Sequence, residues 1–158
     1  DEEMAKEGIA VFASEFMSDG SLYIVGAGST TAKIAEVMGL KKTMLGVDLI
    51  KDEKLIASDV NENAILEHIK NEKSVKLIVS PIGAQGFVFG RGNQQISSKV
   101  LRKIGKDNII IIATPQKLDN TPFLLVDTGD EELDKELSGK TLVVCAYRMA
   151  QRKEIRKD

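Results

Sequence analysis

Apolar residues recur with the period of a helix over the first stretch of the chain. Four of them fall at positions i, i+3, i+4 and i+7 and so share one helical face: Ile9, Phe12, Ala13 and Phe16. Asp19-Gly20 follows, and glycine is the usual residue after a helix C-terminus. Residues 22–25 are then uninterruptedly apolar. The pattern predicts a helix followed by a short buried strand.

Apolar runs and helical patterns alternate along the rest of the chain. Strands are predicted at residues 43–47, 55–57, 75–79, 109–113, 123–126 and 142–146. Helices are predicted around residues 34–38, 65–69, 100–104 and 133–137. Such alternation is typical of right-handed βαβ units and a parallel sheet. We therefore predict one α/β domain over residues 1–158, with three layers and a mainly parallel, Rossmann-like sheet. The basic tail, residues 148–158, is either a terminal strand or a frayed end.

Composition and charge exclude several classes of protein. The chain is 42% hydrophobic and 29% charged, with a formal net charge of −2. This balance is not typical of proteins that bind nucleic acids or membrane surfaces through bulk charge. No apolar run approaches the roughly 20 residues that span a bilayer. The single cysteine, Cys145, lies in an apolar run, so we expect a buried thiol and a cytoplasmic protein.

A long polar connection, PIGAQGFVFGRGNQQIS, occupies residues 81–97 after the strand predicted at 75–79. Its glycines allow backbone N–H groups to approach a ligand closely, and its arginine suits a phosphate or a carboxylate. Ser97 or Ser98 is placed to cap the next helix, whose N-terminus favours an anion. The candidate binding residues in this loop are Gly83, Gln85, Gly86, Gly90, Arg91, Gly92, Asn93, Gln94 and Gln95. A plain surface connection remains the alternative, with residues 87–89 forming a short strand between two glycine turns.

A second candidate anion site, GAGSTT, follows the first strand at residues 26–31. A strand, a glycine turn, hydroxyl groups and a helix N-terminus direct backbone donors to one point. The candidate residues are Gly26, Gly28, Ser29, Thr30 and Thr31. The motif lacks the third glycine of a dinucleotide fingerprint and the lysine of a P-loop. In the alternative interpretation, Ser29 or Thr30 only caps the helix.

Two aspartates, Asp48 and Asp127, each follow a predicted strand. Carboxylates just past the ends of parallel strands lie at the edge of the sheet where ligands bind. They could hold ribose hydroxyls or a metal, although Asp48 could equally cap a turn. We expect both aspartates to meet GAGSTT, the loop 81–97 and Thr114-Pro115 at one edge. Asp59 with Glu62 is predicted to start a helix as a capping box, and the only histidine, His68, is expected to be exposed and structural.

Five blocks of the sequence resemble the C-terminal half of prokaryotic ATP-NAD kinase-like proteins, over about residues 20–147. The blocks are GAGSTTAKIAEVMG, KKTMLGVDLI, PIGAQGFVFGRGNQQIS, IIATPQKL and LLVDTGDEELD. GFVFGRGNQQIS is the most specific, because its glycines, arginine and amides match in order. The resemblance implies a transferase that phosphorylates NAD to NADP with ATP or polyphosphate and a divalent metal such as Mg²⁺.

The family's Gly-Gly-Asp-Gly signature belongs to the N-terminal half and does not occur in this sequence. The resemblance therefore implies the C-terminal domain of a longer protein, with the N-terminal kinase domain as its partner and a small-molecule nucleotide as its ligand. We expect the chain alone to be inactive and assign it no catalytic residue, and the identity of any metal ligand stays unknown.

Two other functions fit the same residues. GAGSTT also resembles the phosphate loop of the ribose-phosphate isomerase-like group, which would make the chain a non-catalytic sugar-phosphate or nucleotide-binding module. Alternatively, the chain is an assembly domain whose apolar edges form a homo-oligomer.

Overall fold

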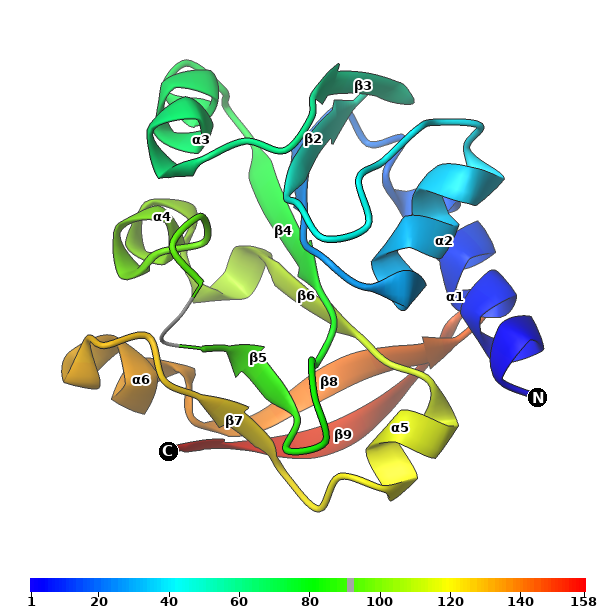
Figure 1. Ribbon diagram of the computed structural model, residues 1–158, viewed down its shortest axis with the longest axis vertical. Helices are drawn as coiled ribbons and strands as arrows, with labels where there is room; N and C mark the ends of the chain where they lie inside the picture. Colours follow the sequence, from blue (N-terminus) through cyan, green and yellow to red (C-terminus); the bar gives the residue numbers. More distant parts are fainter. Residues whose placement is uncertain (91–92) are drawn as a thin grey trace.

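The computed structural model describes residues 1–90 and 93–158, which form a sheet flanked by helices (Figure 1). The strands of the described part are β1 Leu22–Val25, β2 Asp48–Lys51, β3 Lys54–Ala57, β4 Val75–Val79, β5 Phe87–Phe89, β6 Ile109–Ile112, β7 Leu124–Val126, β8 Gly139–Ala146 and β9 Met149–Lys157. The helices there are α1 Glu2–Phe16, α2 Ser29–Val37, α3 Glu62–Ile69, α4 Ser98–Ile104, α5 Pro115–Asp119 and α6 Glu131–Leu137, with a single 3-10 turn at Lys106–Asn108.

All strands of the described residues join one sheet, in the order β3-β2-β1-β4-β6-β8-β9-β7-β5. The pairs β1–β4, β4–β6, β6–β8, β9–β7 and β7–β5 are parallel. The pairs β1–β2, β2–β3 and β8–β9 are antiparallel. The predicted α/β fold with a mainly parallel, Rossmann-like sheet is confirmed.

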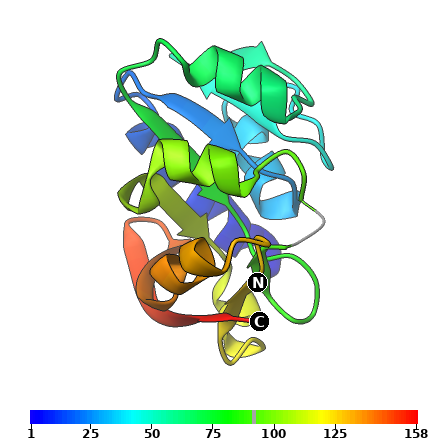
Figure 2. The same cartoon turned by 90° about the vertical axis from the view of Figure 1, so that its left-hand side faces the viewer.

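Helices cover both faces of the sheet, which gives the three predicted layers. In Figure 1, α1 and α2 lie on one side of the sheet, and α3, α4 and α6 lie on the other; these three helices face the viewer in Figure 2. Central strands are buried on both faces and send alternate side chains into two separate cores. In β1, for example, Leu22 and Ile24 enter the core under α3 and α4, whereas Tyr23 and Val25 face α1 and α2.

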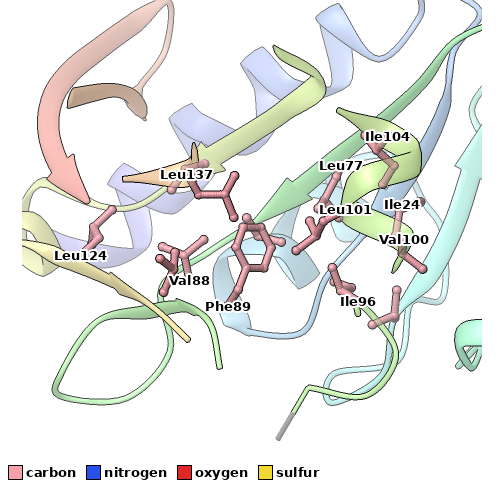
Figure 3. Close-up of a cluster of buried hydrophobic side chains, with 14 of the residues drawn as sticks. Ile24, Leu77, Val88, Phe89, Ile96, Val100, Leu101, Ile104, Leu124 and Leu137 are labelled. Atoms are coloured by element: carbon pink, nitrogen blue, oxygen red, sulfur yellow. The ribbon is translucent and has the colours of Figure 1, made fainter. Parts of the chain in front are cut away.

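The larger core holds the connection between β4 and α4 in place. Val88 and Phe89 of β5 and Ile96 ahead of α4 are at most 4% exposed. They pack with Val100 and Leu101 of α4 in this core (Figure 3). Because the middle of the loop 81–97 and the residue ahead of α4 are buried in this way, Asn93 and Gln95 are held beside Gly26 at the edge of the sheet.

Several predicted elements are confirmed and others are corrected. The first helix, the strands 22–25 and 75–79, the Ser97 cap and the buried Cys145 are as expected. Residues 87–89 do form a strand, and the basic tail forms β9 between β8 and β7. The predicted strand 43–47 is wrong, because those residues form a loop and β2 begins at Asp48. The predicted capping box is also wrong, since Asn61 rather than Asp59 caps α3.

A partly exposed ion pair between Asp19 and Lys76 makes the stability of the fold sensitive to acid. Burial raises the pKa of Asp19, but hydrogen bonds from Lys76, Ser21 and Tyr23 outweigh it and lower the pKa from 3.8 to about 2. A lowered folded-state pKa adds stability above the unfolded value, and this contribution is lost as the pH falls from about 4 towards 2. We expect Asp19→Asn to remove about 1 kcal/mol of this dependence, after allowance for solvent screening. Urea unfolding at pH 7 and pH 3 measures it. If the wild type and Asp19→Asn lost equal stability between pH 7 and pH 3, Asp19 would not be the source of the acid sensitivity.

Candidate functional site

The loops after β1, β4 and β6 meet at one edge of the sheet, because these three strands run parallel and side by side. Beyond β1, the N–H of Gly26 donates to the carbonyl of Ile78 at 2.9 Å, which holds the glycine turn against β4. Residues of GAGSTT and of the loop 81–97 line one cavity, so the proximity predicted for these two segments is confirmed. Three adjoining cavities lie along this edge.

The central cavity has a volume of about 190 Å³ and lies between the two predicted loops. Gly26 and Ala27 line it from the β1–α2 turn, and Asn93 and Gln95 line it from the segment ahead of α4. Its remaining wall is mostly apolar and includes Val79, Val88 and Ile96. The Oδ1 atom of Asn93 accepts a hydrogen bond from the N–H of Ile96 at 3.0 Å, which fixes this amide at the cavity.

A second space, which we call the lysine cavity, adjoins the central cavity and has a volume of about 290 Å³. Gly28, Ser29 and Thr30 line it at the start of α2. Its cationic walls are Lys6 of α1 and Lys117 of α5. Ser80 and Ile82 line both spaces, so the two cavities share one wall.

A third, amide-lined cavity of about 420 Å³ adjoins the central cavity on its other side, with Gln95 common to both. Asn61, Asn63 and Gln94 contribute amides, and Glu62 contributes a carboxylate. The edge thus presents cationic, apolar and amide-rich surfaces in succession. This sequence of surfaces fits an elongated ligand with a charged end and a flat apolar part.

The turn at Gly28 sets the N-terminus of α2. Gly28 caps the helix with φ 125° and ψ 166°, and no side chain caps it, so the alternative that Ser29 or Thr30 does so is wrong. Thr31 is fully buried, and its Oγ1 donates to the carbonyl of Gly28 at 3.0 Å. The first bond within α2 runs from the N–H of Ala32 to the same carbonyl. The N–H groups of Ser29 and Thr30 have no acceptor within the described residues, as expected at a helix start.

The backbone at Gly28 lies in a region that is essentially restricted to glycine. We therefore expect Gly28→Ala to lower the free energy of unfolding by about 1–3 kcal/mol. Gly90→Ala is the control, because an added methyl group there meets nothing within 4 Å and Gly90 lacks a positive φ. Thermal denaturation of both variants tests this; a similar effect at both positions would show that the turn has no special strain.

Asp48 lies at the predicted edge but holds a loop together. It starts β2, which runs antiparallel to β1, and its side chain is fully buried. Its carboxylate accepts hydrogen bonds from the N–H and Oγ1 of Thr43 and from the N–H of Asp59, at 2.6–2.7 Å. The ammonium of Lys42 braces the same loop by donating to two carbonyls, those of Thr43 and Gly46. Burial lowers the pKa of Lys42 below its usual value, and the carboxylates of Asp48 and Asp59 oppose this shift.

Asp127 lies at the other edge, so the expected meeting of both aspartates is wrong. β7 is parallel to β9, and β9 is antiparallel to β8, so β7 runs opposite to β6 and β8. The N–H of Asp127 donates to the carbonyl of Phe89, which lies beside the start of β6 and β8 near Ile109 and Lys140. The sequence indicated a strand before Asp127 correctly but could not give its direction.

The other candidates in the loop 81–97 have mixed positions. Gly83 lines the lysine cavity, whereas Gly86 packs against Thr121 with a φ of 79° and so serves the fold. Gln85 is exposed and, like Gly90, lines none of the three cavities. Arg91 and Gly92 lie outside the described residues.

The residues that the sequence analysis missed are the two lysines of the lysine cavity. Lys117 lies on α5, a helix too short to show a period. Thr114 caps this helix through a hydrogen bond to the N–H of Lys117, and Pro115 is its first residue. A Thr-Pro pair is a typical helix start, so this signal was available in the sequence.

The described residues offer no metal site of their own. No group of three or more His, Cys, Asp or Glu side chains within residues 1–90 and 93–158 could hold a metal ion. In the same part of the chain, none of the helices combines the length and hydrophobicity needed to cross a bilayer.

Comparison with known proteins gave one family. A family model described as the ATP-NAD kinase C-terminal domain matches residues 18–154, which is most of the chain. Searches of the curated proteins and of the solved structures found no significant match. The matched residues include all three cavities except for the contributions of α1.

Proposed function

Since the chain belongs to the ATP-NAD kinase C-terminal domain family, we propose that it provides one half of a nucleotide site for the phosphorylation of NAD to NADP. NAD and ATP are the substrates that the family implies. The observation that carries this proposal is the central cavity, which Gly26 and Ala27 line on one side and Asn93 and Gln95 on the other, at the edge of the sheet where ligands bind.

The central cavity has the chemistry that a nucleoside base requires. Apolar walls from Val79, Val88 and Ile96 suit the faces of a planar ring. The Oδ1 atom of Asn93 is engaged by Ile96, which leaves the NH₂ group of this amide for a ring nitrogen or carbonyl. The amide of Gln95 makes no hydrogen bond within the described residues and can both donate and accept. A few placed polar groups in an apolar pocket are typical of sites that orient a ligand.

Phosphoryl transfer needs more than this chain contains. The Gly-Gly-Asp-Gly signature is absent from the sequence, and the described residues form no acidic or histidine cluster that fits a divalent metal. We therefore propose that the N-terminal domain supplies the groups that act on the phosphates. This chain would bind and orient the nucleotide, and positioning of this kind, together with electrostatic stabilisation, accounts for most of catalysis in phosphoryl transfer.

The partners follow from the same proposal. The N-terminal domain is the expected partner, and light scattering of the chain measures whether two copies also associate. We also propose a cytoplasmic location, on the basis of a single cysteine that is buried and unpaired.

Calorimetry tests the proposed function. The chain is titrated with NAD, NADP, ATP and adenosine, and we expect binding of at least one of them with a Kd below 1 mM. No heat with any of these ligands at millimolar concentration would contradict the proposal. Preferential binding of ribose 5-phosphate, lost in Ser29→Ala, would instead favour a sugar-phosphate module.

A further inference from the structure

We propose that the lysine cavity is a phosphate subsite, which holds the phosphate chain of the nucleotide while the base lies in the central cavity. This inference rests on the proposed function and adds to it the direction in which the ligand lies. Four observations support it: the start of α2, the hydroxyl of Thr30, the two lysines, and the wall that the two cavities share.

The start of α2 directs hydrogen-bond donors at the lysine cavity. The N–H groups of Ser29 and Thr30 have no acceptor in the described part of the chain, and no side chain caps the helix. α2 has nine residues, so its first turn carries the partial positive charge of a helix N-terminus. An anion at this point would accept both N–H groups.

The hydroxyl of Thr30 is the second, independent sign of a ligand. Thr30 is only 7% exposed, and it lines the lysine cavity. Its Oγ1 has no hydrogen-bond partner within the described residues, and it is not among the fully enclosed polar atoms there. The small exposed part of Thr30 therefore includes its hydroxyl group, which is free to bond with a group in the cavity. A buried hydroxyl normally has a partner, and a phosphate oxygen would supply one.

The lysines provide charge from two different helices. Lys117 of α5 donates one hydrogen bond to the carbonyl of Gly83, which places its ammonium across the cavity mouth and leaves two further N–H donors. The side chain of Lys6 of α1 is 17% exposed, and its ammonium lies 3.5 Å from Glu3. Lysine serves phosphate as a compact point charge, so this pair suits a phosphate or pyrophosphate group.

Among the described residues, Glu2 is the one acidic residue that lines the lysine cavity, and its charge opposes that of the lysines. One of its oxygens, Oε1, is buried and has no hydrogen-bond partner in this part of the chain. A carboxylate at this place repels an incoming phosphate, so it limits the affinity of the subsite. Removing the charge at Glu2 is expected to strengthen phosphate binding, which is the opposite of what general damage to the fold would do.

The shared wall determines how the ligand lies. Ser80 and Ile82 line both cavities, so a nucleotide with its base between Ala27 and Gln95 has its phosphates beside Ser80 and Lys117. A cavity at the opposite edge offers a useful contrast. It has a volume of about 270 Å³, and Lys70, Lys73 and Lys103 line it; Lys70 and Lys103 lie at the C-terminal ends of α3 and α4, and Lys73 lies ahead of β4. There Lys70 and Lys103 complement the negative ends of two helices, and no helix N-terminus of the described residues lines the cavity.

Calorimetry with inorganic pyrophosphate, adenosine and ADP tests the phosphate subsite. The wild-type chain should bind pyrophosphate and should bind ADP more tightly than adenosine. Lys117→Met and Thr30→Val should each weaken pyrophosphate and ADP binding, by about tenfold and about fivefold, and leave adenosine binding unchanged. Glu2→Gln should strengthen pyrophosphate binding about two- to fivefold. Lys103→Met, in the cavity at the opposite edge, should change nothing.

The outcomes separate this inference from the proposed function. Two results would overturn the phosphate subsite and preserve the nucleotide site. In the first, ADP binds no more tightly than adenosine; in the second, Lys117→Met and Thr30→Val leave ADP binding intact. Pyrophosphate binding that responds to the three variants, with no binding of adenosine, would support the subsite and refute the base cavity. If Lys117→Met also loses adenosine binding, the loop around Gly83 has loosened and this variant no longer tests the subsite. Pyrophosphate binding by Thr30→Val and Glu2→Gln then decides whether the lysine cavity holds phosphate. No pyrophosphate binding at millimolar concentration would overturn the inference.

Discussion

Replacing Asp48 with alanine is expected to lower the free energy of unfolding by about 3 kcal/mol. The fully buried carboxylate accepts hydrogen bonds from two backbone N–H groups and one hydroxyl. Each buried donor that loses its acceptor costs about 1–3 kcal/mol, and Thr43 and Asp59 would both lose one. Urea denaturation measures the change.

Asp107→Ala is the matched control for Asp48→Ala. Asp107 is exposed and lies in the 3-10 turn ahead of β6, so its loss should change stability by at most about 0.5 kcal/mol. If Asp48→Ala proved as mild as the control and instead abolished nucleotide binding, the carboxylate would have the ribose-binding role that its position in the sequence first indicated. The structure predicts the reverse: a large loss of stability, and weaker binding only through the displaced loop at Leu45, which lines the central cavity.

Filling the central cavity has the largest expected effect on binding. Ala27→Phe introduces a ring at a half-buried position of the cavity wall, in a space of about 190 Å³. The ring would occupy the place of the base, so we expect adenosine affinity to fall about 100-fold, or by about 2.7 kcal/mol. Calorimetry with adenosine measures the loss, and thermal denaturation shows whether the variant remains folded.

Lys73→Phe introduces the same ring in the cavity at the opposite edge and is the control for Ala27→Phe. It should leave adenosine binding unchanged. A comparable loss of affinity in both variants would mean that the ring acts through the fold. Full retention of binding in Ala27→Phe would place the base elsewhere.

Hydrophobic pattern was sufficient for the layers of this fold because its central strands are buried on both faces. The run at 109–113 has no polar residue, and the structure places β6 between β4 and β8 with both faces covered. The hydrophobic pattern failed to predict the direction of those strands whose partners lie far away in the sequence. β9 carries many charged residues, so the hydrophobic pattern gave no clear sign of a strand there. It nevertheless lies between β8 and β7, antiparallel to β8 and parallel to β7, so β7 and β5 run opposite to β6 and β8 on the other side of β9.

The loops of the candidate site could be predicted from the sequence, but its charged residues could not. Glycine turns and helix starts are local features, so GAGSTT and the residues 93–95 could be named from the sequence. Gly26, Ala27, Asn93 and Gln95 of these two segments do border one cavity. The burial of Asp48 depends on a bent loop, 42–47, whose Gly46 packs directly against Thr43 and Asp59. Lys6 and Lys117 reach the site from helices that precede and follow it in the chain, a proximity that only the packing of α1 and α5 determines.

An NMR titration of the ¹⁵N-labelled chain with ADP tests the central claim most directly. We predict that the largest changes in amide chemical shift occur at Ala27, Ser29 and Thr30, at Ser80, and at Gln95, which border the central and lysine cavities. Changes confined to the opposite edge, around Lys73 and Lys103, would contradict a nucleotide site between the two glycine-rich loops.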